Sequence, residues 1–226
     1  MSHSVSQHLR IQVGAYDRTI RRFIPGYDEM LDRAVAAVAS RAPLATAVEL
    51  GAGTGSLSAR LLERVTDVSV ELWDVDETML EQARVRLARH EGRARFVVRS
   101  FAEPLPACDA VMASLALHHL RAADDKTACY SRIAAALEPG GVLVNADATI
   151  PATERGARAT YREWADHLVA SGIAEPDAWQ HFEEWAKEDR YFSVDEELGF
   201  LRTAGLVPRV DWQLGPSTVI VATRPA

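Results

Sequence analysis

A glycine-rich stretch from Val48 to Gly55 has the residue types and spacing needed to hold a nucleotide-like cofactor. It lies between an apolar run and an amphipathic pattern, so small residues there let backbone amides approach a ligand at a helix N-terminus. Its three glycines fit G-x-G-x-G, whereas the dinucleotide fingerprint needs Gly or Ala at the position of Ser56. NAD is therefore disfavoured. A P-loop is disfavoured too, because no Lys-Ser or Lys-Thr follows the glycines.

One carboxylate lies within this stretch and two follow it along the chain. Asp74 ends the next apolar run, where a carboxylate can accept hydrogen bonds from both ribose hydroxyls of an adenosine. Asp76 competes for this role, but its place before Glu77 suits a helix N-cap better. Glu49 directly precedes the glycines, and we expect it to face the cationic part of the cofactor. A solvated acid at a strand end is the alternative for Glu49.

Two adjacent histidines and an aspartate could supply acid–base chemistry. His118 and His119 follow the fourth apolar run, and Asp147 follows the fifth. Ligands of open α/β sheets bind at the carboxyl ends of the strands, so these side chains could meet at one edge. An imidazole with a pKa near about 6.5 can take a proton from a hydroxyl, and a carboxylate can orient it. A purely structural role in capping the loop stays open.

The elements that must position these groups follow from a regular alternation of apolar runs and amphipathic patterns. A parallel sheet with helices on both faces requires this alternation, so the sequence predicts a doubly wound α/β fold. We expect strands at residues 46–50, 69–73, 95–98, 110–114, 142–146, 207–213 and 217–223. We expect helices at residues 6–23, 27–40, 55–65, 77–90, 124–137 and 194–204. A turn at 138–141 launches the fifth strand.

The segment 151–192 has a helical pattern that is rich in aromatic residues, among them Trp164, Trp179 and Trp185. Packing of the segment onto the body of the protein explains most of these aromatics. Some of them could instead line a pocket for a substrate.

Four motifs together resemble the motif series of the class I S-adenosylmethionine (SAM)-dependent methyltransferases. They are Glu49 to Gly55, Asp74, Leu115 to Leu120, and Leu137 to Gly141, and the similarity spans roughly residues 44–147. The resemblance implies a Rossmann-like, mostly parallel seven-stranded sheet with an antiparallel last strand. It also implies N-terminal helices and, after strand five, a helical insertion.

The N-terminal runs Tyr16 to Arg18 and Arg22 to Tyr27 resemble the opening of carboxy-SAM synthase and its methyltransferase relatives. In such enzymes this helix closes over the cofactor. Tyr16 is then a lid residue, and Arg21 or Arg22 a partner for a carboxylate of the substrate or cofactor. An ordinary amphipathic helix with solvated arginines is an equal alternative. The loop with His118 and His119 departs from carboxy-SAM synthase itself.

The resemblance assigns SAM as cofactor and indicates which residues hold the ligands. In the family, the turn after strand three commonly offers an Asp to the adenine, but Ser100 stands at that place here. The expected cofactor-binding residues are Tyr16, Glu49, Gly51, Ala52, Gly53, Gly55, Asp74, Val75, Ser100, Phe101, Ser114 and Leu115. The expected catalytic residues are His118, His119 and Asp147, and the expected substrate-binding residues are Arg21, Arg22, Trp164 and Trp185.

We expect a single methyltransferase domain over residues 1–226 in four parts. Residues 1–43 form a helical lid, 44–150 the SAM-binding core, 151–192 a helical substrate cap, and 193–226 the helix and strands that complete the sheet. A length of 226 residues with 48% hydrophobic residues suits one substantial core.

Composition narrows the classes of molecule that this protein can bind. The net charge of −7 and the lack of a dense Lys/Arg run argue against a nucleic-acid substrate. Cys108 and Cys129 match no redox or zinc motif, and no metal-ligand spacing stands out, so we expect no metal. No run reaches the roughly 18 apolar residues of a membrane span. We therefore expect a cytoplasmic enzyme with a small-molecule substrate, and a homodimer stays open.

The leading hypothesis is a SAM-dependent methyltransferase acting on a small molecule, with O-methylation favoured. One alternative is a SAM-binding enzyme that modifies the cofactor or catalyses a non-methylating reaction. The other is a non-catalytic SAM-binding protein.

Overall fold

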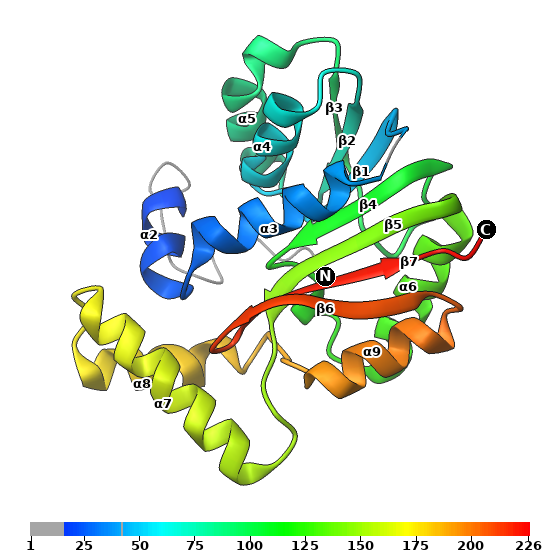
Figure 1. Ribbon diagram of the computed structural model, residues 1–226. Coiled ribbons are helices and arrows are strands. Elements are labelled where there is room, and N and C mark those ends of the chain that lie inside the picture. Colours follow the sequence, from blue (N-terminus) through cyan, green and yellow to red (C-terminus); the bar gives the residue numbers. More distant parts are fainter. Residues whose placement is uncertain (1–15, 42) are drawn as a thin grey trace.

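The computed structural model describes residues 16–41 and 43–226, and a seven-stranded sheet forms its centre (Figure 1). The strand order is β3-β2-β1-β4-β5-β7-β6. The strands are β1 (Thr46–Leu50), β2 (Ser69–Asp74), β3 (Ala94–Val98), β4 (Cys108–Ser114), β5 (Leu137–Ala148), β6 (Val207–Leu214) and β7 (Ser217–Thr223). The first five strands pair in parallel, and β7 runs antiparallel to both of its neighbours. The Rossmann-like fold with an antiparallel last strand is confirmed.

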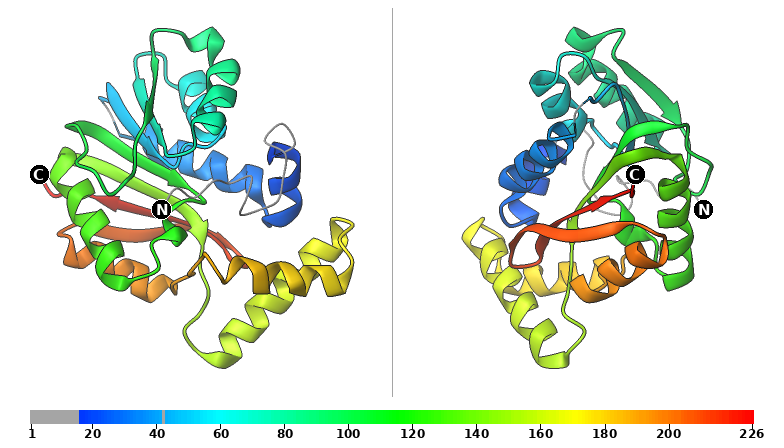
Figure 2. Two further views of the ribbon diagram at one scale, coloured as in Figure 1. Left: turned by 180° about the vertical axis from the view of Figure 1, so that it is seen from behind. Right: turned by 45° about the vertical axis from the view of Figure 1, so that its right-hand side comes forward.

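Helices cover both faces of the sheet. Figure 2 shows α3 (Tyr27–Ala39) and α6 (Ala123–Ala136) on opposite sides. Buried apolar side chains of α3, α4 (Ser56–Arg64) and α5 (Glu77–Arg86) pack into one core cluster. Those of α6 and α9 (Val194–Thr203) pack into a second cluster on the other face. The apolar strands of a parallel sheet need this cover on both sides.

The cap consists of α2 (Tyr16–Phe23), α7 (Glu154–Ala170) and α8 (Glu175–Trp185), which gather at one end of the sheet (Figure 1). The indole of Trp164 is 1% exposed. Its Nε1 donates a hydrogen bond of 2.6 Å to the carbonyl of Phe23. The aromatic segment 151–192 is therefore helical, as expected, and its indole NH ties α7 to α2. The division into one domain with the expected boundaries stays a prediction.

Two elements differ clearly from the sequence expectation, and a third is described only in part. The helix expected to run to residue 90 ends at Arg86, and a short 3-10 turn, Ala88–His90, follows. The turn expected at 138–141 lies inside β5, where the pairing with β4 shifts between Cys108 and Ala110 and Gly140 has φ 71°. The expected helix 6–23 is described only from Tyr16, and its earlier part lies outside the described residues.

No described helix combines the length and the apolar character that a membrane crossing requires.

A buried ion pair joins α6 to α9. Lys126 is 1% exposed, and its Nζ lies 2.8 Å from Glu197 Oε1. The same ammonium donates a hydrogen bond of 2.8 Å to the carbonyl of Leu117 in the loop after β4. The hydroxyl of Tyr130 donates to the other oxygen of Glu197. A buried charge is tolerated only when it is paired and hydrogen-bonded, and both charges meet that condition here.

Replacing Lys126 by Met should therefore destabilise the fold by about 3–5 kcal/mol, because the carboxylate of Glu197 would stay buried without its counter-charge. The double variant Lys126→Met with Glu197→Gln should recover part of this loss. Urea unfolding of the three proteins measures both effects. Equal stability of the single and the double variant would contradict the role of the ion pair.

Candidate functional site

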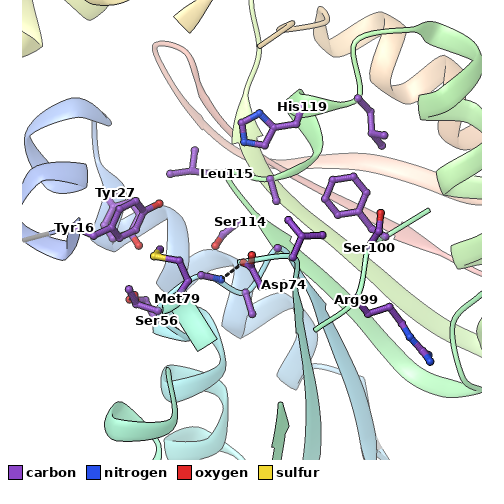
Figure 3. Close-up of a pocket in the computed structure, with 18 residues that line it drawn as sticks. Tyr16, Tyr27, Ser56, Asp74, Met79, Arg99, Ser100, Ser114, Leu115 and His119 are labelled. Atoms are coloured by element: carbon purple, nitrogen blue, oxygen red, sulfur yellow. Dashed lines mark hydrogen bonds between the residues drawn. The ribbon is translucent and has the colours of Figure 1, made fainter. Parts of the chain in front are cut away.

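A cavity of about 230 Å³ lies at the carboxyl edge of the sheet, beside the glycine-rich turn (Figure 3). We call it the glycine-turn cavity. Its lining residues are Tyr16, Tyr27, Gly51, Ala52, Gly53, Thr54, Ser56, Asp74, Val75, Met79, Arg99, Ser100, Phe101, Ser114, Leu115, Ala116, His119 and Leu120. Figure 3 shows Tyr16 and Tyr27 on one side, Ser100 on the opposite side, and Asp74 between them.

The glycine turn has a backbone that side chains would disturb. Gly51 and Gly53 have φ values of 64° and 53°, in the left-handed region that glycine enters without cost. A Cβ added at Gly51 would lie 2.5 Å from the Cβ of Ala116, in the loop after β4. Glycine at position 51 therefore lets these two loops approach each other at the floor of the cavity.

Asp74 closes the turn from the end of β2. Its Oδ2 accepts a hydrogen bond of 2.7 Å from the amide of Gly53, and its Oδ1 accepts one of 2.9 Å from the amide of Asp76. Burial raises the pKa of Asp74, and these backbone donors oppose the rise. Asp76 instead caps α5, because its carboxylate accepts from Thr78. The carboxylate of Asp74 is therefore the acid that faces the cavity.

Tyr16 enters the cavity from α2, which is fastened to the core next to it. The carboxylate of Asp17 accepts hydrogen bonds from Thr54 at 2.8 Å and from Ser56 at 3.3 Å. It also forms an ion pair with Arg86 of α5. Burial raises the pKa of the Tyr16 phenol, which therefore stays neutral. These contacts hold α2 over the cavity.

Glu49 is not among the residues that line the cavity, and its expected role toward the cofactor stays a prediction. Its side chain is fully buried beneath the turn, where Oε2 accepts from the amide and the hydroxyl of Ser58. Its Oε1 has no hydrogen-bond partner among the described residues. Burial raises the pKa of Glu49 to about 8, so the neutral carboxyl predominates at neutral pH.

A second cavity, the cap cavity, encloses about 60 Å³ between the sheet edge and the cap. Its lining residues are Tyr16, Ile20, Phe23, Ile24, Leu115, His118, His119, Ala148, Trp164, Trp185, Asp189 and Tyr191. Tyr16, Leu115 and His119 line both cavities. Ligands in the two cavities would therefore be neighbours.

The two histidines and Asp147 meet at the sheet edge. His118 Nδ1 lies 2.6 Å from Asp147 Oδ1, and the amide of His118 donates 3.1 Å to Asp147 Oδ2. Asp189, from the segment after α8, lies 3.0 Å from His119 Nδ1 and 3.8 Å from His118 Nε2. We call His118, His119 and Asp189 the histidine cluster.

The electrostatic surroundings favour the charged forms of both His118 and Asp147. Burial alone would lower the pKa of His118, but the carboxylates of Asp147 and Asp189 outweigh burial and raise it. Burial alone would raise the pKa of Asp147, but the imidazole of His118 lowers it. Asp147 is therefore an ionised carboxylate that accepts hydrogen bonds, and its own proton plays no part.

Leu115 turns the chain into this loop with a φ of 49°. A branched apolar residue adopts this left-handed conformation only when its surroundings hold it there, at a cost of about 1–3 kcal/mol. Its amide donates 2.9 Å to the carbonyl of Ala146 in β5. The strained backbone of Leu115 lies at the wall between the two cavities. Strained backbone conformations concentrate at functional sites.

Three further expected site residues lie outside the lining of both cavities. Arg21 is exposed and pairs with Asp28, with Nε 2.9 Å from its carboxylate. Arg22 donates to the carbonyls of Ser171 and Gly172, which follow α7. Neither arginine lines the glycine-turn cavity or the cap cavity. Gly55 caps α4, and a Cβ there would lie 3.1 Å from that of Ala83, so this glycine serves packing.

The structure brings the other expected residues to the cavities, except Asp147, which lies behind His118, and it adds new ones. Ser100 lines the glycine-turn cavity, and its hydroxyl accepts from the amide of Ala102 at 3.1 Å. Sequence reasoning missed Met79, which follows Asp76 in the first turn of α5 and could have been found from that place. It also missed Asp189 and Tyr191, which the cap brings in from a distant segment without a local signal.

Comparison with known proteins agrees with this geometry. A family model described as a methyltransferase domain matches residues 48–143. No curated protein matches the chain. An O-methyltransferase family protein from Burkholderia thailandensis has a TM-score of 0.67 at 21% identity, over 88% of this chain and 56% of that one. The SAM-dependent methyltransferase SibL, in its apo form, has a TM-score of 0.63 at 18% identity, over 90% and 60%.

The N-methyltransferase NodS from Bradyrhizobium japonicum WM9 has a TM-score of 0.61 at 16% identity, over 89% of this chain and 98% of that one. At these identities the likenesses define the fold. The chain spans less than two thirds of the length of the Burkholderia protein and of SibL.

The match over residues 48–143 supports the resemblance to the class I SAM-dependent methyltransferases, and the solved structures show the same fold. SAM is the cofactor that this family implies. The similarity of the N-terminal runs to carboxy-SAM synthase relatives stays a prediction.

The residues present fit this cofactor. Asp74 offers carboxylate oxygens to ribose hydroxyls, the glycine turn leaves room for a close approach of the ligand, and Phe101 presents a ring for an adenine. The particular contacts stay predictions.

Replacing Asp74 by Asn should weaken the binding of SAM and S-adenosylhomocysteine by about 1–3 kcal/mol, because one acceptor for the ribose hydroxyls is lost. Calorimetric titration measures this change. Asp76→Asn is the matched control and should bind normally, since Asn also caps helices. Unchanged affinity in the Asp74 variant would remove this residue from the cofactor site.

Glu49→Gln should make the protein less sensitive to alkaline pH. Because the pKa of Glu49 is raised, the folded state retains a proton that the unfolded state has lost, and wild-type stability falls as pH rises from about 4.5 towards 8. Gln does not titrate, so the variant should gain about 1–3 kcal/mol relative to wild type over this interval. Urea unfolding at several pH values measures the difference. Glu91→Gln, at an exposed position, is the control. Parallel pH profiles for Glu49→Gln and wild type would refute the assignment.

Proposed function

We propose that this protein transfers a methyl group from SAM to an oxygen atom of a small molecule held in the cap cavity. The observation that carries the proposal is the common wall between the two cavities, formed by Tyr16, Leu115 and His119. Methyl transfer is an in-line displacement, and its main demand is that donor and acceptor lie next to each other in the right orientation. Two cavities with a common wall meet this demand.

Bound SAM supplies a methyl group on a sulfonium. Its transfer to a hydroxyl forms one carbon–oxygen bond and breaks one carbon–sulfur bond, whose electron pair stays on sulfur, and the hydroxyl proton leaves. The protein must therefore hold the acceptor and help to remove its proton. The histidine cluster lies at the wall of the cap cavity, where it can act on that proton.

Asp147 is a positioning residue in this proposal. A carboxylate accepts hydrogen bonds only, so the 2.6 Å contact places a hydrogen on Nδ1 of His118, and in the neutral imidazole Nε2 then has the lone pair. The backbone amide of His118 fixes the other oxygen of Asp147. This arrangement holds the ring in one tautomer, with Nε2 on the side of Asp189.

The cap selects the acceptor by its shape and polarity. Phe23, Trp164, Trp185 and Tyr191 line the cap cavity and pack ring against ring, with Trp164 and Trp185 centroids 5.6 Å apart. Such walls favour a flat, largely apolar molecule over a polymer or a highly charged substrate. These walls favour a small, largely apolar molecule with a hydroxyl group as the acceptor.

An amine acceptor is the second candidate. The N-methyltransferase NodS is similar to this chain over 98% of the length of NodS and 89% of the length of this chain. The histidine cluster can also take a proton from an amine. Modification of the cofactor itself and binding without turnover remain alternatives that the test must separate.

The test is incubation of the purified protein with SAM and a panel of small phenols, alcohols and amines, with mass spectrometry of both products. An added mass of one methylene unit on a hydroxyl acceptor, with matching release of S-adenosylhomocysteine, is the expected result. Methylated amines alone would favour the second candidate. SAM binding without consumption would indicate a binding protein.

Trp185→Ala should raise the KM for the acceptor about 10-fold or more and leave SAM affinity nearly unchanged, because this ring lines only the cap cavity. Trp179 belongs to the same helix but lines neither cavity, so Trp179→Ala is the matched control. Steady-state kinetics and SAM titration measure both effects. A change in SAM affinity without a change in acceptor KM would contradict the role of the cap.

A further inference from the structure

We propose that the histidine cluster binds one divalent transition-metal cation beside the common wall of the two cavities. One ligand atom from each of His118, His119 and Asp189 lies within 4.8 Å of the other two. His119 Nδ1 and Asp189 Oδ1 are 3.0 Å apart, and His118 Nε2 and Asp189 Oδ1 are 3.8 Å apart. The inference rests on the proposed function and deepens it, because it concerns how the same site handles the acceptor.

These separations suit a metal ion. Zinc binds histidine nitrogen and carboxylate oxygen at about 2.0–2.2 Å in tetrahedral geometry, which places neighbouring ligand atoms roughly 3.3 Å apart. The two separations to Asp189 lie on either side of this value. Side-chain rotations of the two histidines would bring the three atoms, now within 4.8 Å of one another, onto one ion.

The surroundings of the ligands have the form of a metal site. A metal-binding histidine usually donates its other ring N–H to a carboxylate, which fixes the tautomer. Asp147 does this for His118, because it holds the hydrogen on Nδ1 and leaves Nε2 to bind. The second oxygen of Asp189 accepts a hydrogen bond of 2.8 Å from the hydroxyl of Tyr191. Two of the three ligands are thus oriented by buried partners.

The protein provides three ligands and an open side. Catalytic zinc sites use three protein ligands and keep a further position for water or substrate. All three residues of the histidine cluster line the cap cavity, so that position would face the molecule held there. A divalent cation acts as a Lewis acid and lowers the pKa of an oxygen acid bound to it. The preferred acceptor is therefore a hydroxyl that can bind the ion.

The donor set also selects among metals. Two imidazoles and one carboxylate suit zinc, cobalt, iron or manganese, whereas magnesium prefers a shell of oxygens. The charge balance is favourable, because the carboxylates of Asp147 and Asp189 offset both charges of a divalent ion. Sequence inspection offered no sign of this site, because Asp189 lies far along the chain from the two histidines.

The experiment uses the full chain without a polyhistidine tag, stripped with a chelator. Cobalt is titrated in and followed by its visible absorption, and zinc is then used to displace it. We expect one cobalt per chain, displacement by zinc, and no displacement by magnesium at the same concentration. His119→Ala and Asp189→Asn should each weaken cobalt binding at least ~10-fold. His90→Ala, remote from both cavities, is the control.

Absence of cobalt binding to the wild type, or binding that neither site variant changes, would overturn the proposal. Circular dichroism checks that each variant is folded, and His119 is half-buried, so its variant serves if the Asp189 variant unfolds. Methyl transfer without metal binding would reject the metal site and leave the proposed function intact. Metal binding without transfer to any acceptor would support the metal site and count against the proposed function.

Discussion

The parallel register between β4 and β5 places Ser114 opposite Ala146, so the segment that follows β4 leaves the sheet beside the end of β5. His118 lies on that segment and Asp147 lies next to Ala146 in β5, and their contact is a direct result of the register. A shift of one residue would send alternate side chains to the other face of the sheet and separate the pair. The core clusters on both faces hold the register, because each strand contributes apolar side chains to them.

The loop after β4 is held from below as well as from the side. Lys126 reaches up from α6 to the carbonyl of Leu117, while its charge is balanced by Glu197 of α9. Hydrophobic packing alone would not fix the direction of this carbonyl. Buried polar contacts are directional, so they can orient the residue that follows, His118, where packing could only confine it.

Much of the fold and part of the candidate site can be predicted from the sequence. The order of strands and helices followed from alternating apolar runs, and the glycine turn and Asp74 followed from spacing that a ligand requires. Glu49 lies outside the cavity lining, because the sequence places it next to the turn but does not tell on which side of the strand its carboxyl lies. Arg21 and Arg22 also lie outside it, since Asp28 and the carbonyls after α7 accept from their side chains. Asp189 and Tyr191 could not be found, because only the folding of the cap brings them to the sheet edge.

The wall formed by Tyr16, Leu115 and His119 has a thermodynamic consequence. The same three side chains line both cavities, so a ligand that shifts any of them in one cavity changes the free energy with which the other is filled. Linkage makes such an effect reciprocal: the factor by which the first ligand alters the affinity of the second equals the factor by which the second alters the affinity of the first. Where a ligand moves this wall, the two binding steps form one cooperative equilibrium, and each dissociation constant must be stated together with the occupancy of the neighbouring cavity.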